Sequence, residues 1–223
     1  ARELAERFRA YGIAVILGGF HVSGMLAMAS STPPHLQRLL DVGVTLVKGE
    51  VEETWAVILR DAVAGKLAPL YDSIDDKPEL FHAPIPRLDP ELLRKFVYRR
   101  FGTIDSARGC PFGCSFCTII NVQGREMRFR DPAAIGTTIA ENYRATGTHH
   151  YFFTDDNFAR NDNWRAILAT LIRLREEGGI PVRFLMQFCS LERLCAHPSG
   201  TQGQCPAPHP LESVRTIGCS LLL

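Results

Sequence analysis

No uninterrupted apolar run in this sequence reaches the about 20 residues that a membrane-spanning helix requires. Neither sign of charge dominates, because 25 Lys and Arg residues stand against 24 Asp and Glu residues, giving a net charge of +1. The first residues contain no initiator Met, no apolar signal-peptide core and no Arg- and Ser-rich presequence. These absences predict a cytoplasmic protein with no transmembrane segment, and they give no electrostatic reason to expect a nucleic-acid partner.

The cysteines are the first positive signal. The sequence has seven of them, an odd number, and three (Cys110, Cys114 and Cys117) are clustered in one short segment. This pattern argues against a disulfide framework and favours metal binding in a reducing compartment. Hydrophobic residues make up 46% of the chain and charged residues 22%, which is typical of a globular protein of one or two domains.

The first 65 residues alternate between short apolar runs and amphipathic segments, which is typical of half of a doubly wound α/β domain. The glycines and prolines that punctuate the pattern place the ends of the elements. The expected elements, in chain order, are a helix over 1–12, a strand over 13–17, a loop over 18–24, a helix over 33–43, a strand over 44–50 and a helix over 52–65.

Residues 66–100 contain five prolines separated by charged residues, which predicts a linker between two domains. After it, strands and helices alternate again, so we expect parallel strands joined by right-handed crossovers, as at the start of a barrel. Asp131 is the expected N-cap of the first helix. The expected elements are a strand over 103–108, a helix over 132–144, a strand over 149–156, a helix over 161–179 and a strand over 181–187.

The pattern stops after Gln187. Residues 188–223 contain four cysteines and four prolines among Ser, Thr and Gly, with no sustained helix or strand period. Two interpretations stay open, a native irregular tail or a segment translated in the wrong reading frame, and we favour the second. The sequence therefore predicts four segments: 1–65, 66–100, 101–187 and 188–223.

The three clustered cysteines have the spacing C-x3-C-x2-C. Thiolates are the usual ligands of iron–sulfur clusters, and three of them on a four-iron cluster leave one iron without a protein ligand. An open coordination position is typical of a reactive metal site. A structural zinc site would need a fourth Cys or His, and the nearest histidines are His149 and His150. Ligand number and softness favour a [4Fe–4S] cluster over zinc or over unligated thiols.

The segment RGCPFGCSFCTI, residues 108–119, resembles the signature loop of radical S-adenosylmethionine (SAM) enzymes. The resemblance implies that Cys110, Cys114 and Cys117 hold a [4Fe–4S] cluster, and that SAM at the open iron is cleaved to methionine and a 5′-deoxyadenosyl radical. It implies an electron donor such as a flavodoxin or a ferredoxin. It also implies that Phe116 lies near the adenine of SAM, and simple packing of this ring in the core is an equal alternative.

Further SAM contacts are expected where the barrel strands end. In the family, polar groups after the second strand often hold the SAM amino group, usually in a Gly-Gly-Glu-like motif that this sequence lacks. Asp155 and Asp156 occupy the corresponding place, and capping of the following helix is the alternative for either residue. Gln187, at the end of the third strand, is a further candidate of the same kind.

Two other groups of residues have simple structural explanations. Arg125, Arg128 and Arg130 follow the cysteines, and a solvated basic loop explains them more simply than contact with SAM or an acidic substrate. Trp55 and Trp164 lie in helical patterns. We therefore expect both indole rings in the core.

The N-terminal half carries a second resemblance. GGFHVSG, followed by VKGEVEE after the next strand, is similar to the later half of the cobalamin-binding domain that precedes many radical SAM domains. The resemblance implies that Gly18, Gly19 and His21, together with Gly49 and Glu50, pack against the corrin and its nucleotide tail. The alternative is a tight glycine turn followed by a surface histidine. The residues before the first strand, where the family can carry an Asp-x-His-x-x-Gly cobalt-ligand motif, are absent from this sequence, so it leaves open whether cobalt has a lower ligand from the protein.

The sequence is thus identified as a fragment of a cobalamin (B12)-binding-domain-containing radical SAM protein. The expected fold is α/β: the C-terminal half of a doubly wound, Rossmann-like cobalamin-binding domain, followed by the start of a radical SAM partial (β/α) TIM-type barrel. The resemblance implies radical C–H chemistry, most commonly methyl transfer, on a small-molecule or lipid-like substrate. The alternative hypothesis is a non-catalytic metal- or corrinoid-binding module, that is, an inactive fragment.

Overall fold

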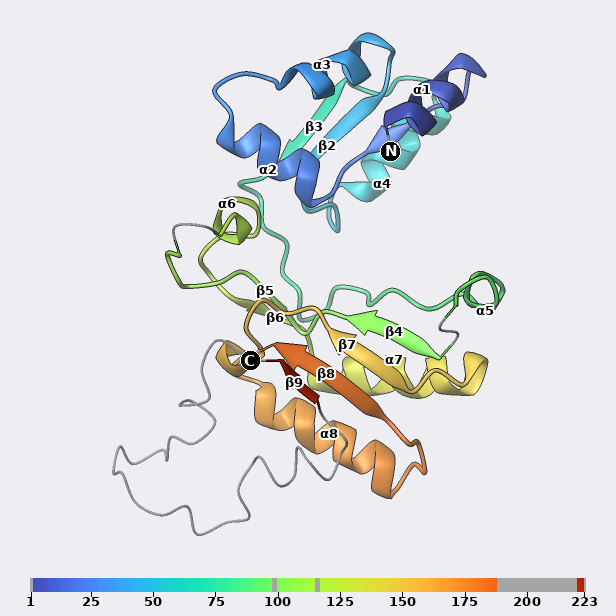
Figure 1. The fold of residues 1–223 in the computed structure, drawn as a ribbon, viewed down its shortest axis with the longest axis vertical. Helices are drawn as coiled ribbons and strands as arrows, with labels where there is room; N and C mark the ends of the chain where they lie inside the picture. Colours follow the sequence, from blue (N-terminus) through green and yellow to red (C-terminus); the bar gives the residue numbers. More distant parts are fainter. Residues whose placement is uncertain (1, 98–99, 115–116, 188–219, 223) are drawn as a thin grey trace. The chain divides into compact units, whose positions relative to one another are not determined.

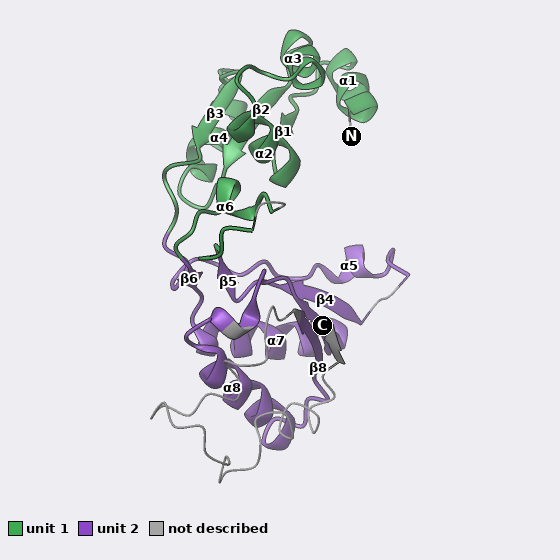
Figure 2. Ribbon diagram, turned by 60° about the vertical axis from the view of Figure 1, so that its left-hand side comes forward, with its two compact units in different colours: residues 1–78, 109–126 green, residues 79–108, 127–223 purple. Residues whose placement is uncertain are grey.

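The computed structural model describes residues 2–97, 100–114, 117–187 and 220–222 (Figure 1). The chain divides into two compact units, each built on a parallel sheet (Figure 2). Unit 1 contains residues 1–78 and 109–126, and unit 2 contains residues 79–108 and 127–223. Within the described residues, no helix is long and apolar enough to cross a membrane.

Unit 1 is a three-stranded parallel sheet in the order β1-β2-β3, with helices in each crossover. Its strands are β1 (Ile16–Leu17), β2 (Thr45–Gly49) and β3 (Leu70–Ser73). Its helices are α1 (Arg2–Ala10), α2 (Phe20–Met28), α3 (Pro34–Asp41), α4 (Trp55–Val63) and α6 (Ile119–Val122). The core forms where apolar residues of α1, α2 and α3 meet β2 and the residue before it, and its buried members are Ala5, Val22, Leu36, Leu39, Val44 and Leu46.

Three predictions for unit 1 are wrong. Residues 18–24 are not a loop, because Gly19 takes a φ of 93° and turns the chain directly from β1 into α2, which begins at Phe20. Residues 66–100 are not only a linker, since β3 pairs in parallel with β2. β3 buries only Ser73, so it is held by backbone pairing and gives little hydrophobic signal. Trp55 is also not a core residue, because it is 43% exposed.

Unit 2 contains a four-stranded parallel sheet in the order β4-β7-β8-β9 and a separate two-stranded antiparallel ribbon. The sheet strands are β4 (Phe101–Ile104), β7 (His150–Phe153), β8 (Arg183–Gln187) and β9 (Ser220–Leu222). The ribbon strands are β5 (Ala107–Arg108) and β6 (Arg128–Phe129). The helical segments are α5 (Pro90–Leu93), α7 (Pro132–Thr146), the 3-10 turn η1 (Phe158–Arg160) and α8 (Trp164–Glu176).

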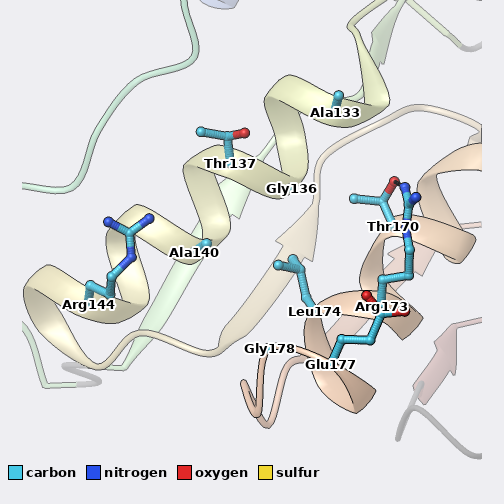
Figure 3. Close-up of a pocket in the computed structure, with 10 residues that line it drawn as sticks. All are labelled: Ala133, Gly136, Thr137, Ala140, Arg144, Thr170, Arg173, Leu174, Glu177 and Gly178. Carbon is cyan, nitrogen blue, oxygen red and sulfur yellow. Dashed lines mark hydrogen bonds between the residues drawn. The ribbon is translucent and has the colours of Figure 1, made fainter.

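The two long helices of unit 2 confirm their sequence signals. The carboxylate of Asp131 accepts a hydrogen bond from the Ala133 amide at 2.9 Å and caps α7, as predicted. Gly136 lets α8 approach closely, because a Cβ at this position would collide with the Thr170 side chain. Small and aliphatic residues line most of the shallow groove between these helices (Figure 3). Both helices cover a core of strand residues that includes Tyr151, Phe153 and Phe184.

The end of the chain differs in part from expectation. β9 pairs in parallel with β8, with Ser220 beside Leu185, so the sheet gains a strand where none was predicted. The rest of the predicted irregular tail, residues 188–219, lies outside the described residues. Both main sheets are parallel, which confirms an α/β class with parallel strands.

Candidate functional site

The cysteine loop, residues 109–126, belongs to unit 1 (Figure 2). Within the described residues, Cys110, Cys114 and Cys117 form no disulfide bond, and all three are half-buried. The Cys110 amide donates to the Gly124 carbonyl at 3.2 Å, and the Cys117 amide donates to the Cys114 carbonyl at 3.1 Å. The backbone of the loop is therefore folded on itself around the thiols.

The three thiols share one loop, but their side chains do not form a ready ligand set. Across the described part of the chain, no three His, Cys, Asp or Glu side chains are arranged to hold a metal ion. The donor set nevertheless suits an iron–sulfur cluster with three protein ligands, because it consists of soft thiolates only. The cluster ligands therefore stay a prediction that rests on donor chemistry.

The two ends of the cysteine loop are held together. The Gly109 amide donates to the Gln123 side-chain oxygen at 3.1 Å. Gly109 has a φ of 92°, and a Cβ there would collide with the Glu126 carbonyl oxygen. This position therefore requires glycine for two independent reasons. The loop is closed at its base by contacts that a larger residue would break.

The cysteine loop is also packed against α2. A Cβ on Gly24 would lie 3.6 Å from the Val122 side chain, so α2 and α6 are in close contact. Lys77, just after β3, donates to the carbonyls of Ile74 and Val122. Within unit 1 the structure thus brings together the cysteine loop and the helix that follows the Gly18-Gly19 turn. Sequence reasoning placed these features in separate domains and missed this contact.

The residues expected at a cobalamin site lie at the carboxyl edge of the unit 1 sheet. Gly18 and Gly19 follow β1, while Gly49 and Glu50 end β2. Ser23 of α2 accepts a hydrogen bond from the Gly49 amide at 3.0 Å and joins the two segments. No heavy atom of the described residues would lie within 4 Å of a Cβ on Gly19, so the backbone is open at this turn.

Gly49 and His21 have specific local geometry at that edge. Gly49 has a φ of 100°, and a Cβ there would lie 2.6 Å from the backbone of Ser73, so only glycine suits this approach to β3. The Ser73 hydroxyl donates to the Glu50 carbonyl at 2.7 Å. The exposed ring of His21 lies with its Nε2 atom 3.1 Å from the Nε2 atom of His35. The predicted residues therefore share one edge, with His21 on the first turn of α2.

In unit 2, the structure separates the roles of the two aspartates after β7. Asp155 is 2% exposed and accepts hydrogen bonds from the Ser106 amide at 2.6 Å, the Ala107 amide at 3.3 Å and the Ser106 hydroxyl. Burial raises the pKa of Asp155 to about 7, although the hydrogen bonds from Ser106 and Ala107 act in the opposite direction. Asp156 is half-buried, and burial raises the pKa of its carboxyl to about 6.

The alternative role of these aspartates as helix caps is wrong. The N-cap of α8 is Asn163, whose amide donates to the Asn161 side chain at 2.8 Å, and the residue before η1 is Asn157. Gln187 ends β8, but its side chain lies outside the described part of the structure, as does Phe116. Their proposed SAM contacts stay predictions.

Arg130 is not part of a solvated loop, contrary to the expectation. It is 1% exposed, and its guanidinium binds both carboxylate oxygens of Asp105 at 3.1 Å. Burial acts to raise the pKa of Asp105, but the hydrogen bond from Arg130 and the charges of Arg108 and Arg130 outweigh it and lower that pKa. The signal available in the sequence was Asp105 itself, the one acidic residue inside the strand candidate 103–108.

Comparison with known proteins points to one class of enzyme, although no protein-family model matches the chain. Bacteriochlorophyllide d C-8(2)-methyltransferase of Chlorobaculum tepidum is 32% identical over 174 residues, covering 72% of this chain and 36% of the relative. Hopanoid C-2 methylase of Rhodopseudomonas palustris is 24% identical, covering 71% of this chain and 28% of the relative. The chain thus spans about a third of the length of these curated relatives.

Two solved structures share the fold. The radical SAM methyltransferase TsrM from Kitasatospora setae, solved with cobalamin and a [4Fe-4S] cluster, matches with a TM-score of 0.66 and 18% identity, over 98% of this chain and 43% of TsrM. The cobalamin-dependent SAM radical enzyme OxsB, solved with aqua-cobalamin and SAM, matches with a TM-score of 0.58 and 15% identity, over 89% of this chain and 29% of OxsB. At these identities the likeness establishes the fold.

The relatives and the solved structures are enzymes, and the curated relatives are named as methyltransferases or a methylase. The chain is thus similar in sequence to curated methyltransferases and similar in fold to cobalamin-dependent radical SAM enzymes, in agreement with the family resemblance predicted from the sequence.

Proposed function

We propose that this chain forms part of a cobalamin-dependent radical SAM methyltransferase. Residues 1–78 provide the later half of the cobalamin-binding domain, and residues 101–187 provide the first strands of the radical SAM barrel. The observation that carries the proposal is the C-x3-C-x2-C loop, which packs in unit 1 against the helix after the Gly18-Gly19 turn. A cysteine loop beside a glycine-rich sheet edge suits an enzyme that uses two cofactors together.

In this proposal Cys110, Cys114 and Cys117 hold a [4Fe–4S] cluster through their thiolates. When bound, the cluster and SAM supply a 5′-deoxyadenosyl radical for hydrogen abstraction. Asp156 is the better of the two aspartates for the SAM amino group, because the carboxylate of Asp155 is already bonded to Ser106 and Ala107. Asp156 stays largely ionised at neutral pH even with its pKa raised to about 6, so it can accept hydrogen bonds from an ammonium group.

The glycine-rich edge is the proposed cobalamin site. Gly18, Gly19 and Gly49 let backbone approach a large flat ligand, while His21 and Glu50 supply polar contacts beside it. Two observations support this assignment. The open space at Gly19 keeps the backbone accessible there, and the hydrogen bond from the Gly49 amide to the Ser23 hydroxyl keeps the end of β2 ordered. The substrate is a small or lipid-like molecule, and a flavodoxin or ferredoxin donates the electron.

Anaerobic reconstitution of the whole chain with iron and sulfide tests the radical SAM assignment. With SAM and dithionite, we expect 5′-deoxyadenosine to form, and we expect neither cluster absorbance nor cleavage with Cys114→Ala. Cys195→Ala changes a cysteine outside the loop and is the matched control. A chain that binds zinc and cleaves no SAM would instead be a non-catalytic metal-binding module, the second candidate.

Hydroxocobalamin titration tests the corrinoid site separately. Gly12 and Gly19 both have positive φ and open space at the Cβ position, so Gly12→Val and Gly19→Val introduce the same kind of strain. We expect Gly19→Val to weaken cobalamin binding and Gly12→Val to leave it unchanged. Equal binding by both variants would remove the glycine turn from the cobalamin site.

A further inference from the structure

The chain enters and leaves the cysteine loop through the antiparallel ribbon of unit 2. In this ribbon Ala107 pairs with Phe129, and Arg108 pairs with Arg128. The Arg130 amide donates to the Ser106 carbonyl at 2.9 Å and extends the pairing by one step. The ribbon has only two residues per strand, so its own backbone bonds give it little rigidity.

The ion pair between Asp105 and Arg130 lies at the end of this ribbon that is away from the loop, because Asp105 precedes β5 and Arg130 follows β6. The Arg130 guanidinium donates two parallel hydrogen bonds to the Asp105 carboxylate, at 3.1 Å each. Its Nη1 group donates to the carbonyls of Ala83 at 3.1 Å and Pro84 at 3.4 Å. Such a bidentate contact fixes both distance and angle, which a lysine ammonium cannot do.

The segment that precedes the loop is also held from the opposite direction. Asp155, after β7, accepts from the amides of Ser106 and Ala107. The Asn161 side chain donates to the Ser106 hydroxyl at 2.9 Å. Residues from three separate parts of unit 2, Arg130, Asp155 and Asn161, therefore hold the segment Asp105–Ala107.

A buried ion pair is a poor means of stabilising a fold, because apolar residues of similar size often serve as well or better. What it provides is a defined geometry, and here that geometry lies at the base of the two-stranded ribbon that carries the cysteine loop. We propose that Asp105 and Arg130 are positioning residues for the cysteine loop: their ion pair sets the spacing of the strands that carry it, and so the arrangement of the three thiolates. This inference rests on the proposed function of the loop.

The test uses iron–sulfide reconstitution of the whole chain, with iron retention measured against a competing chelator and the cluster followed by EPR and redox titration. The variants are Arg130→Lys, Arg130→Met and Asp105→Asn. Removing outer support of this kind typically lowers metal affinity about 10- to 100-fold. We expect a loss in this range for all three variants, including the charge-conserving lysine, together with an altered EPR signal and a shifted midpoint potential.

Two controls separate positioning from general stability. Arg87→Met removes an exposed pair with Glu141, which lies in the same unit at 3.1 Å, and should leave the cluster unchanged. Ile167→Ala destabilises the buried core of unit 2 without touching the ribbon. The inference is overturned if Ile167→Ala alters iron affinity and the EPR signal as much as Arg130→Lys does, or if all ribbon variants match the wild-type chain.

The double variant Asp105→Asn/Arg130→Met completes a double-mutant cycle with the two single variants. If the two residues act as a pair, it loses no more iron affinity than the worse single variant, and additive losses would contradict the pairing. The outcomes also distinguish this inference from the proposed function. A wild-type chain that forms no [4Fe–4S] cluster contradicts the function, whereas a normal cluster in every ribbon variant contradicts only the positioning role.

Discussion

The carboxyl edges of the two parallel sheets are built from opposite kinds of residue. At the edge of unit 1, glycines leave the backbone accessible, as at Gly19, or let two strands approach closely, as at Gly49. At the edge of unit 2, charged side chains are buried and bonded to protein groups, as with Arg130 and Asp155. The same topology therefore supports two different tasks.

The contrast has a physical basis. A large flat ligand is best held by backbone and small side chains that approach it closely, so an edge made of glycine needs few charges. A reactive loop needs its ends held in one geometry, and buried bidentate hydrogen bonds provide that geometry at the cost of desolvation. In the proposed function, substitutions at the edge of unit 1 should therefore change ligand binding. Substitutions at the edge of unit 2 should instead change the geometry of the cysteine loop.

Gly49→Ala should give the largest effect on the glycine edge. The new Cβ would lie 2.6 Å from the Ser73 backbone at a φ of 100°, so we expect unit 1 to lose about 3 kcal/mol or more of stability. Hydrogen exchange of the β2 and β3 amides measures this loss. Gly65→Ala, at a φ of 66° with open space, should lose only about 1–2 kcal/mol. Similar losses in both variants would refute the close approach of Gly49 to β3.

Asp155→Asn should change how the stability of unit 2 depends on pH. Because the folded pKa of Asp155 is raised to about 7 from 3.8, the wild-type fold is favoured while this carboxyl is protonated. Relative to Asp155→Asn, wild-type stability should fall as pH rises from 3.8 to about 7, and then stay level. A difference of about three between the two pKa values corresponds to a change of about 4 kcal/mol.

Urea unfolding followed by Trp164 fluorescence, in a Trp55→Phe background, measures the pH dependence in unit 2. Asp162→Asn changes an exposed aspartate nearby and serves as the control. If the difference between wild type and Asp155→Asn is independent of pH over this range, then Asp155 is ionised throughout and the burial argument fails.

Ser23→Ala should give a smaller effect, confined to the glycine edge. The substitution leaves the Gly49 amide without its acceptor at 3.0 Å, and we expect a cost of about 1–2 kcal/mol. Exchange of the Gly49 amide hydrogen, measured by NMR, should accelerate while exchange in unit 2 stays unchanged. Ser30→Ala changes an exposed serine and is the matched control. An unchanged Gly49 exchange rate would exclude the Ser23 bond as the link between α2 and β2.

Lys48→Met should give the smallest effect. Lys48 pairs with Asp72 at 2.8 Å, but Asp72 is 43% exposed, so water and salt screen the interaction. The expected loss is under about 1 kcal/mol and should shrink further in high salt. Thermal unfolding at two salt concentrations measures it. A loss as large as that of Gly49→Ala would mean that charge, and not glycine geometry, holds this edge.

Sequence reasoning succeeded where the signal is local. The cap of α7 depends on Asp131 and on the amide of Ala133 two residues later, so the pattern predicted the helix start. It failed where the partner is distant or where little is buried. β3 buries only one of its four residues, and Arg130 becomes buried because Asp105, 25 residues away, supplies its countercharge.

By itself, the sequence determined the donor atoms that the cysteine loop offers, its family resemblance and the alternation of strands and helices, because these depend on residue type and short spacing. Tertiary structure decided that Asp155 is buried, that Arg130 is paired, and that the cysteine loop packs with α2 in unit 1. Desolvation and ion pairing depend on which distant segments meet, and no local pattern in the chain specifies those contacts.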